Sequence, residues 1–205
     1  MTELAGRLAS VKVSGSPLGL AGETLTRISD TVWQINTAAK QVLDRDITVI
    51  LEKDTAGVWA DITYKSVDKL SGTFTFAAPG HAAGSNIRVR VGNYLPMATA
   101  AYAHEYTYSR GATLHEITPF LATHKKRLTG DKFASGTLSQ WDVEDSYFED
   151  ALMAGDPVVL ELRDTVAGSP QRVWALLDSS ELQAAIGSPQ KEVVTFISTD
   201  ELLTL

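Results

Sequence analysis

Apolar and polar residues alternate in short runs through the first half of the chain, a pattern that predicts β-strands. Successive side chains of a strand point to opposite faces, so a strand with one buried face alternates with a period of two residues. Ala56-Gly57 and Pro79-Gly80 separate some of these runs and predict turns. The predicted strands cover residues 31–37, 47–51, 62–66, 73–77 and 87–91. We therefore expect a small antiparallel sandwich over residues 23–95.

Turn-forming residues are frequent in the segment before this block. Residues 7–13 have the composition of a strand, but three glycines and one proline follow between positions 15 and 22. Glycine and proline this close together interrupt both helices and strands. We therefore expect residues 1–22 to form an N-terminal arm that contains one strand within residues 7–13 and is flexible beyond it. Deletion of the arm is expected to leave a folded monomer.

The second half, from a boundary predicted at Tyr94-Leu95-Pro96, combines strands with one helix. Residues 99–109 have strand character and place Tyr102, Tyr106 and Tyr108 on one face. Further strands are predicted over residues 158–162, 173–177 and 193–198, and a short helix over residues 180–186. We expect residues 96–205 to form the main β core.

The clearest helix signal covers residues 143–154. Asp142 precedes it, where a carboxylate can accept hydrogen bonds from the free N–H groups of the first turn. Apolar residues recur at helical spacing between Val143 and Leu152. Gly155 follows, where the left-handed conformation that ends many helices is needed, and Pro157 prevents continuation.

The charge is distributed unevenly along the chain. The net charge is −7, yet residues 1–95 carry a balance of +1 and residues 96–205 a balance of −8. A surface that binds duplex DNA needs clustered positive charge, so the second half is poorly suited to that function. The chain has no apolar run of roughly 18 residues and no apolar segment behind basic residues at its start. We expect neither a membrane span nor a cleaved signal.

No group of residues matches a known catalytic or ligand-binding pattern. The carboxylates between Asp142 and Asp150 lack the turn-forming glycine of a calcium loop, and we interpret them as capping and solvated groups. His104-Glu105 and His115-Glu116 lack the second histidine of the zinc motif H-E-x-x-H. The chain has no cysteine and no serine in a G-x-S-x-G elbow. We therefore expect no catalytic residue, no cofactor and no metal site, and expect that the chain is not an enzyme.

Lys125-Lys126-Arg127 is the only basic cluster of the sequence. It favours a contact with an acidic surface of a neighbouring copy, such as the helix after Asp142, because opposite charges attract. A solvated loop is the alternative interpretation. Trp141 is a second candidate subunit contact, because a large aromatic side chain without basic neighbours is more often a core or interface anchor than a platform for bases.

From roughly Tyr94 onward, about half of the chain resembles the tail tube (major tail) proteins of long-tailed bacteriophages. In that family a Glu/Asp-x-Thr-x-Phe element precedes a Ser-Gly strand, an aromatic-Asp turn and a helix. The matching segments here are Glu116-Ile117-Thr118-Pro119-Phe120, Arg127-Leu128-Thr129-Gly130, Ala134-Ser135-Gly136-Thr137-Leu138, Trp141-Asp142 and Pro157-Val158-Val159-Leu160.

The resemblance implies a mainly β fold, an antiparallel sandwich or barrel with one flanking helix, to which this chain adds the strand-rich block of residues 23–95. It also implies hexameric rings whose inner sheets join into a barrel, and which stack into a tube that conducts DNA during ejection. The type VI secretion tube protein is similar in fold. The implied partners are further copies of the chain and other phage tail proteins. The implied location is the virion, after synthesis in the host cytoplasm.

An acidic second half suits such a tube, because negative charge repels the phosphates of passing DNA. The arm is expected to become ordered on a neighbouring ring, so its deletion should block stacking. Its candidate stacking residues are Leu4, Arg7, Leu8, Leu18 and Leu20. The alternative function is a β-sandwich adhesin, or another module that binds carbohydrate or a surface protein.

Overall fold

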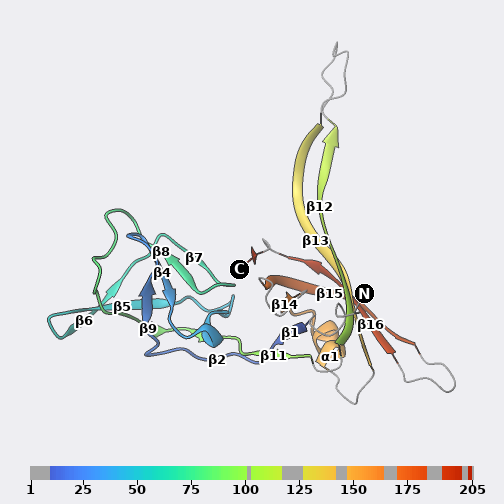
Figure 1. Cartoon of the computed structure of the whole chain (residues 1–205), viewed down its shortest axis with the longest axis horizontal. Helices are drawn as coiled ribbons and strands as arrows, with labels where there is room; N and C mark the ends of the chain where they lie inside the picture. The colour runs from blue at the N-terminus through green and yellow to red at the C-terminus, as the bar shows by residue number, and fades with distance from the viewer. Residues whose placement is uncertain are drawn as a thin grey trace, which may run out of the picture. The chain divides into compact units, whose positions relative to one another are not determined.

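The computed structural model describes residues 10–100, 103–116, 127–141, 147–163, 170–183, 191–199 and 203–204. The chain is mainly β and forms two compact units. Unit 1 consists of Met1–Val13 and Thr99–Thr204, and unit 2 of Ser14–Ala98. Figure 1 shows the strands of both units, coloured by residue number from blue to red. The prediction of a mainly β fold is confirmed, and α1 (Tyr147–Ala154) is the one α-helix among the described residues.

Unit 1 is built around one sheet of eight strands. Seven strands follow the order β11-β1-β14-β15-β16-β13-β12, and the eighth, β17, pairs with β15 outside this linear order. All neighbouring pairs from β1 to β12 are antiparallel. The strands are β1 (Ser10–Ser14), β11 (Met97–Thr99), β12 (Ala103–Glu116), β13 (Arg127–Trp141), β14 (Val158–Arg163), β15 (Gln171–Gln183), β16 (Lys191–Ser198) and β17 (Leu203–Thr204).

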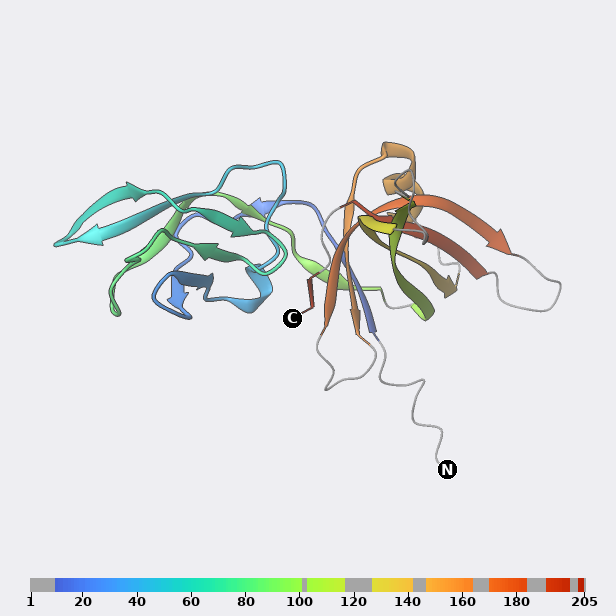
Figure 2. The same ribbon diagram turned by 90° about the horizontal axis from the view of Figure 1, so that it is seen from above.

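The core of unit 1 gathers side chains from strands far apart in the sheet. Val11 of β1 and Leu138 of β13 belong to one buried cluster, although three strands lie between them. Two such strands share a core only when the sheet curves onto itself, and Figure 2 shows this curvature. Phe148 of α1 joins the same cluster. The other buried members are Val158, Leu160, Leu162, Val173, Ala175, Leu177, Val194 and Phe196.

Helix α1 ends as the sequence predicts. Gly155 has a φ of 70°, in the left-handed region that glycine adopts without steric cost. Its N–H donates to the carbonyls of Ala151 at 3.0 Å and Leu152 at 3.2 Å, which satisfies acceptors of the last turn. The predicted cap at Asp142 and the predicted first turn lie outside the described residues.

Unit 2 contains three small sheets, with the orders β10-β2, β3-β4-β8-β7 and β6-β5-β9. Thr55 and Val58 pair across a two-residue turn in which Ala56 and Gly57 have φ values of 55° and 86°. Positive φ at both positions is what a tight hairpin turn requires, so the turn predicted there is confirmed. The strands are β2 (Leu18–Gly19), β3 (Leu25–Arg27), β4 (Val32–Ile35), β5 (Ile50–Thr55), β6 (Val58–Ile62), β7 (Ser66–Asp68), β8 (Thr73–Thr75), β9 (Ile87–Val91) and β10 (Asn93–Tyr94), and a 3-10 turn covers Ala38–Lys40.

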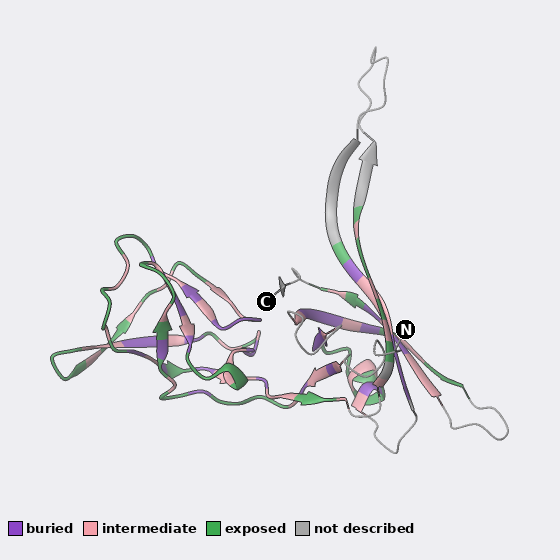
Figure 3. Ribbon diagram, in the orientation of Figure 1, coloured by how far each residue is buried: buried purple, intermediate pink, exposed green. Residues whose placement is uncertain are grey.

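The core of unit 2 combines aromatic and aliphatic side chains. Trp33 and Phe74 are fully buried, and the ring of Tyr64 meets Phe74 edge to face with centroids 5.2 Å apart. The Tyr64 hydroxyl donates to the Val49 carbonyl at 2.9 Å. The strand predicted over residues 62–66 is therefore wrong: β6 ends at Ile62, and the chain turns so that Tyr64 packs against this core. Figure 3 shows the buried stretches of each unit in purple.

A lysine organises the loop before β5. The Lys69 ammonium group donates to the carbonyls of Asp44, Arg45 and Ile47 at 3.1, 2.7 and 2.9 Å. Partial burial is the main reason why the pKa of Lys69 is lowered from its ordinary value. One ammonium group thus provides a hydrogen-bond donor for three backbone carbonyls that lie outside the strands. These bonds hold the loop in one conformation without regular secondary structure.

The strand predicted within residues 7–13 is confirmed where the structure describes it, whereas the expectation of a flexible arm is wrong for residues 15–22. Residues Ser10–Ser14 form β1, which pairs with β14 inside the sheet of unit 1. Leu20 is 1% exposed and lies in the core of unit 2. The glycines and the proline of this segment interrupt its secondary structure, but strand pairing fixes β1 and burial fixes Leu20. Residues 1–9 lie outside the described residues.

The helix predicted over residues 180–186 is also wrong where the structure describes it. Strand β15 continues to Gln183, and Glu181 lies opposite Val193 of β16. A register shift between Leu177 and Ser179 marks a bulge, beyond which the pairing continues. Pairing along a long neighbouring strand outweighs the weak local preference for a helix.

Candidate assembly surface

The sheet of unit 1 ends on a long strand with an open edge. Strand β12 has 14 residues and pairs along one side with β13. On its other side no strand among the described residues is paired with it. An open edge presents a row of backbone N–H and C=O groups to any strand that approaches. This edge is therefore able to bind a further strand by backbone hydrogen bonds.

Strands β12 and β13 extend together beyond the rest of their sheet (Figure 1). Strand β13 pairs with β16 only from Ser135 to Trp141, whereas its residues 127–134 pair with residues 110–116 of β12 alone. We call these two segments the β12–β13 extension. A ribbon of two strands is marginally stable by itself in water. The extension therefore has the architecture of an arm that gains stability from a partner.

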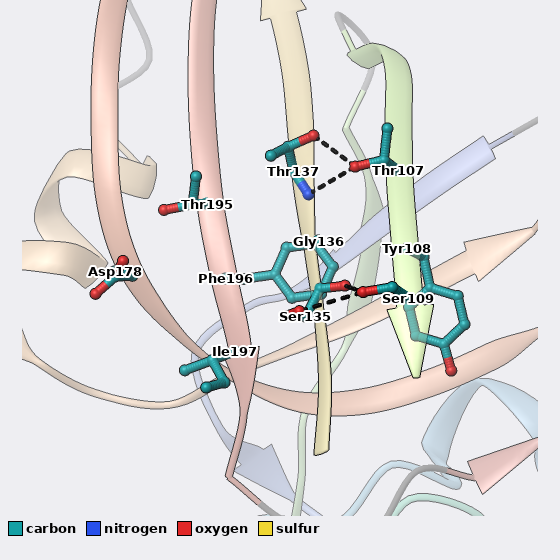
Figure 4. Close-up of a pocket in the computed structure, with 10 residues that line it drawn as sticks. All are labelled: Thr107, Tyr108, Ser109, Ser135, Gly136, Thr137, Asp178, Thr195, Phe196 and Ile197. Carbon is teal, nitrogen blue, oxygen red and sulfur yellow. Dashed lines mark hydrogen bonds between the residues drawn. The ribbon is translucent and has the colours of Figure 1, made fainter. Parts of the chain in front are cut away.

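A row of four hydroxyl side chains crosses the sheet next to the open edge. The register places Thr107 of β12 opposite Thr137 of β13. Thr137 in turn lies opposite Thr195 of β16, and Thr195 lies opposite Ser179 of β15. The Oγ1 atoms of Thr107 and Thr137 are 2.7 Å apart, as are the hydroxyl oxygens of Ser179 and Thr195. Figure 4 shows the first three residues of this hydroxyl row on adjacent strands.

A pocket lies beside the hydroxyl row (Figure 4). Ser109 and Ser135 extend the hydroxyl surface there, with their Oγ atoms 3.3 Å apart, and Asp178 and Ile197 lie close by. The ten described lining residues include no histidine, lysine or arginine. General acid–base chemistry needs a proton donor and acceptor within hydrogen-bond reach of each other or of a substrate. The lining provides hydroxyl groups and one carboxylate, which form a polar surface rather than a catalytic pair.

Carboxylates flank the hydroxyl row. In the neighbouring row, Glu105 of β12 lies opposite Ser139, and Glu181 of β15 lies opposite Val193. Both glutamates are exposed, and so is Asp178. The Lys191 ammonium group, 30% exposed, lies 3.8 Å from a Glu105 carboxylate oxygen. The described part of this face therefore carries more negative than positive charge.

A glycine makes the close packing of these strands possible. Gly136 lies opposite both Tyr108 and Phe196, within the Ser-Gly segment found in the sequence. A Cβ atom at this position would lie 2.1 Å from the Thr107 carbonyl oxygen and 2.8 Å from Cζ of Phe196. Real Cβ atoms do not approach other atoms so closely. The ring of Phe196 thus occupies the space that a side chain at position 136 would fill.

A buried ion cluster joins β1, β14 and β15. Glu161 is 1% exposed, and its carboxylate oxygens lie 2.8 Å from Nζ of Lys12 and 2.8 Å from Nε of Arg172. Burial by itself raises the pKa of Glu161, but hydrogen bonds from the two cations and their charges lower it below its ordinary value of 4.5. The cluster fixes the three strands side by side, because a buried carboxylate without its cations would be strongly destabilising.

The structure separates the two predicted subunit contacts. Arg127 and Trp141 are the first and last residues of β13, so the length of that strand lies between them. Arg127 pairs with Glu116 at the end of the extension, and Trp141 pairs with Lys191. Lys125 and Lys126 lie outside the described residues, as do the side chains of Arg127 and Trp141.

Of the five predicted stacking residues, the structure describes Leu18 and Leu20. Leu18 is 49% exposed on β2, whereas Leu20 is buried in the core of unit 2 and is not available to a neighbouring copy. Leu4, Arg7 and Leu8 lie outside the described residues.

The hydroxyl row itself was not recognised in the sequence. Its signal was serine and threonine at alternate positions, in Thr107-Tyr108-Ser109 and in Ser135-Gly136-Thr137-Leu138-Ser139. Alternation shows that these hydroxyls share one face of their own strand. It does not show that the strands are neighbours in a register that aligns the hydroxyls.

No helix among the described residues is long and apolar enough to cross a membrane. No three histidine, aspartate or glutamate side chains among them gather in a way that could hold a metal ion.

No protein-family model matches the sequence, and no curated protein matches it. Two of the solved structures that resemble the fold come from gene transfer agent particles. One is the tail of an empty gene transfer agent (GTA) particle, computed with helical refinement and C6 symmetry; it is 11% identical, with a TM-score of 0.46 over 54% of this chain and 87% of its own. The other is the virion of a native GTA particle; it is 13% identical, with a TM-score of 0.46 over 53% of this chain and 88% of its own.

Proposed function

We propose that the chain is a structural subunit of a phage-type tail tube, in which copies join into rings and the rings stack around a DNA channel. The observation that carries this proposal is the open edge of β12. An edge that binds a different surface of the next copy makes a head-to-tail contact, and repetition of such a contact closes a ring when the rotation allows it. Closure into a barrel also removes the exposed edge, which is an aggregation hazard in a monomer.

The β12–β13 extension supports the stacking of one ring on the next. It lacks a third strand among the described residues, so contact with another copy would add the buried surface that a two-stranded ribbon needs. The segment that joins its strands carries Lys125 and Lys126. We propose that this basic segment contacts an acidic surface of another copy, such as the exposed Glu149 and Asp150 of α1.

The charge of the chain supports a conduit for DNA rather than a DNA-binding protein. Residues 96–205 carry a balance of −8, and the hydroxyl face adds exposed carboxylates beside the open edge. Negative charge repels phosphate groups, so DNA would pass without being held. On the sequence resemblance, we propose six copies in each ring, other tail proteins as further partners, and a place in the virion after synthesis in the host cytoplasm.

Electron microscopy of the purified protein tests the proposal, together with two single-proline variants of β12. Successive residues of a strand point their N–H groups to opposite edges, and proline has no N–H group. One of the variants Ser109→Pro and Arg110→Pro therefore removes a backbone hydrogen bond to β13. The other removes only an N–H group that points to the open edge. The wild type should form rings or tubes of uniform bore. The variant that keeps the wild-type melting temperature should remain monomeric, and the other should be less stable.

Two results would contradict the proposal. A wild-type protein that stays monomeric at every concentration would exclude self-assembly as its function. Normal tubes from both proline variants would show that the outer edge of β12 is not the contact between copies.

A further inference from the structure

We infer that the hydroxyl row, with the residues beside it, lines the bore of the tube and is the surface past which DNA slides. The inference rests on the proposed function and adds which side of the sheet faces the channel. It concerns the face formed by β12, β13, β16 and residues 178–183 of β15, which we call the hydroxyl face.

The two sides of these strands differ in what they contact. Leu138, Val194 and Phe196 point to the core of unit 1, where Phe148 of α1 packs on the same cluster. Their immediate neighbours in sequence point the other way, because side chains alternate along a strand. On that other side Thr107, Ser109 and Asp178 are exposed. The hydroxyl face is therefore the side of the sheet that its own core and helix do not cover.

The position of the hydroxyl row relative to the open edge makes it a repeating feature of a ring. The row runs from Ser179 on β15 across β16 and β13 to Thr107 on β12, the edge strand. A row of paired residues crosses the strands of a sheet, in the direction of the ladder hydrogen bonds. If a neighbouring copy continues the sheet beyond β12, the hydroxyl surface continues with it around the ring.

The chemistry of this face suits a wall that touches DNA without binding it. Proteins hold the DNA backbone with lysine and arginine, and also with neutral donors such as serine and threonine hydroxyls and backbone N–H groups. Here the hydroxyls of Thr107 and Thr137 are hydrogen-bonded to each other, so one of their two protons is not available to a phosphate. Glu105, Asp178 and Glu181 outnumber Lys191, which pairs with Glu105. Phosphates therefore meet repulsion and few donors along this face.

Site-specific thiol labelling of assembled tubes tests the inference, because the chain has no cysteine of its own. Ser109→Cys exchanges one atom at an exposed position of the hydroxyl face, and Asp178→Cys places a thiol on the same face away from the open edge. Met153→Cys provides the comparison, because Met153 is 81% exposed on α1, on the core side of the sheet. Each variant is treated with N-ethylmaleimide or with maleimide coupled to a large globular protein that cannot enter the bore.

All three thiols should react with both reagents in free subunits. In tubes, the thiols at positions 109 and 178 should react with N-ethylmaleimide and at least about tenfold more slowly with the coupled protein, a ratio that corresponds to about 1.4 kcal/mol of added barrier. The thiol at position 153 should still react with the coupled protein.

The outcomes separate the inference from the proposed function. Tubes in which positions 109 and 178 react readily with the coupled protein would overturn the inference, because the hydroxyl face would then lie outside. Tubes in which neither reagent reaches these positions would also overturn it, because the face would then be buried between copies. Failure of the wild type to form tubes would overturn the proposed function and the inference with it.

Discussion

Replacement of Gly136 by alanine tests whether the strands at the open edge depend on close packing. The new Cβ would lie 2.1 Å from the backbone oxygen of Thr107 and 2.8 Å from the Phe196 ring. The oxygen belongs to β12 and moves only if that strand shifts, and Phe196 is 2% exposed, so its ring has little room to turn away. The alanine therefore forces β12 and β13 apart at the hydroxyl row.

The expected loss of stability is about 2 kcal/mol. Overpacking of a well-packed site costs about 1–3 kcal/mol, and a contact with backbone belongs at the upper end of that range. Alanine offsets roughly 0.5–1 kcal/mol of this loss of stability, because it loses less conformational entropy on folding than glycine does. For a unit of this size, 2 kcal/mol lowers the melting temperature by about 8 °C.

Differential scanning calorimetry measures this loss, with Gly111→Ala as the matched control. Gly111 lies on β12 opposite Phe133, and its added Cβ would meet the Phe133 ring at 2.6 Å. Phe133 is 38% exposed, so the far end of its ring can swing outward, and the cost should stay within about 0.5 kcal/mol. Wild-type stability of Gly136→Ala, or an equal loss in Gly111→Ala, would refute the argument.

Two further predictions concern the ion cluster and the start of the chain. Because the pKa of Glu161 is lower in the fold than its ordinary value of 4.5, the carboxylate stabilises unit 1 above that value and loses this contribution as the pH falls through the folded pKa. In chemical denaturation, the free energy of unfolding of Glu161→Gln should be about 3 kcal/mol below that of the wild type at neutral pH. It should also change less than that of the wild type as the pH falls through the acid range. The same pH dependence in both proteins would contradict this prediction. Deletion of residues 1–22 should unfold the protein, because it removes β1 and the buried Leu20, whereas a deletion that stops at residue 9 keeps both. A cooperative melt of the longer deletion, followed by circular dichroism, would show that reasoning to be wrong.

Local patterns were sufficient where a feature depends on neighbouring residues alone. Alternation predicted the strand that the structure has at Ile87–Val91, and Ala56-Gly57 predicted the hairpin turn after β5. Gly155 marked the end of α1, because only the local conformation matters there. The same kind of reasoning was wrong for Leu20 and for residues 180–183, since burial and pairing with distant strands decide their structure.

The sequence by itself determined the strand-rich composition, the helix near residue 150, the negative charge of the second half and the resemblance to tail tube proteins. These properties depend on residue type and on short spacing, which can be read along the chain. Only the tertiary structure decided that β12 forms an open edge, that Glu161 is buried between Lys12 and Arg172, and that four hydroxyls align into one row. Each of these depends on register between strands far apart in sequence, and register is set by the packing of the whole sheet.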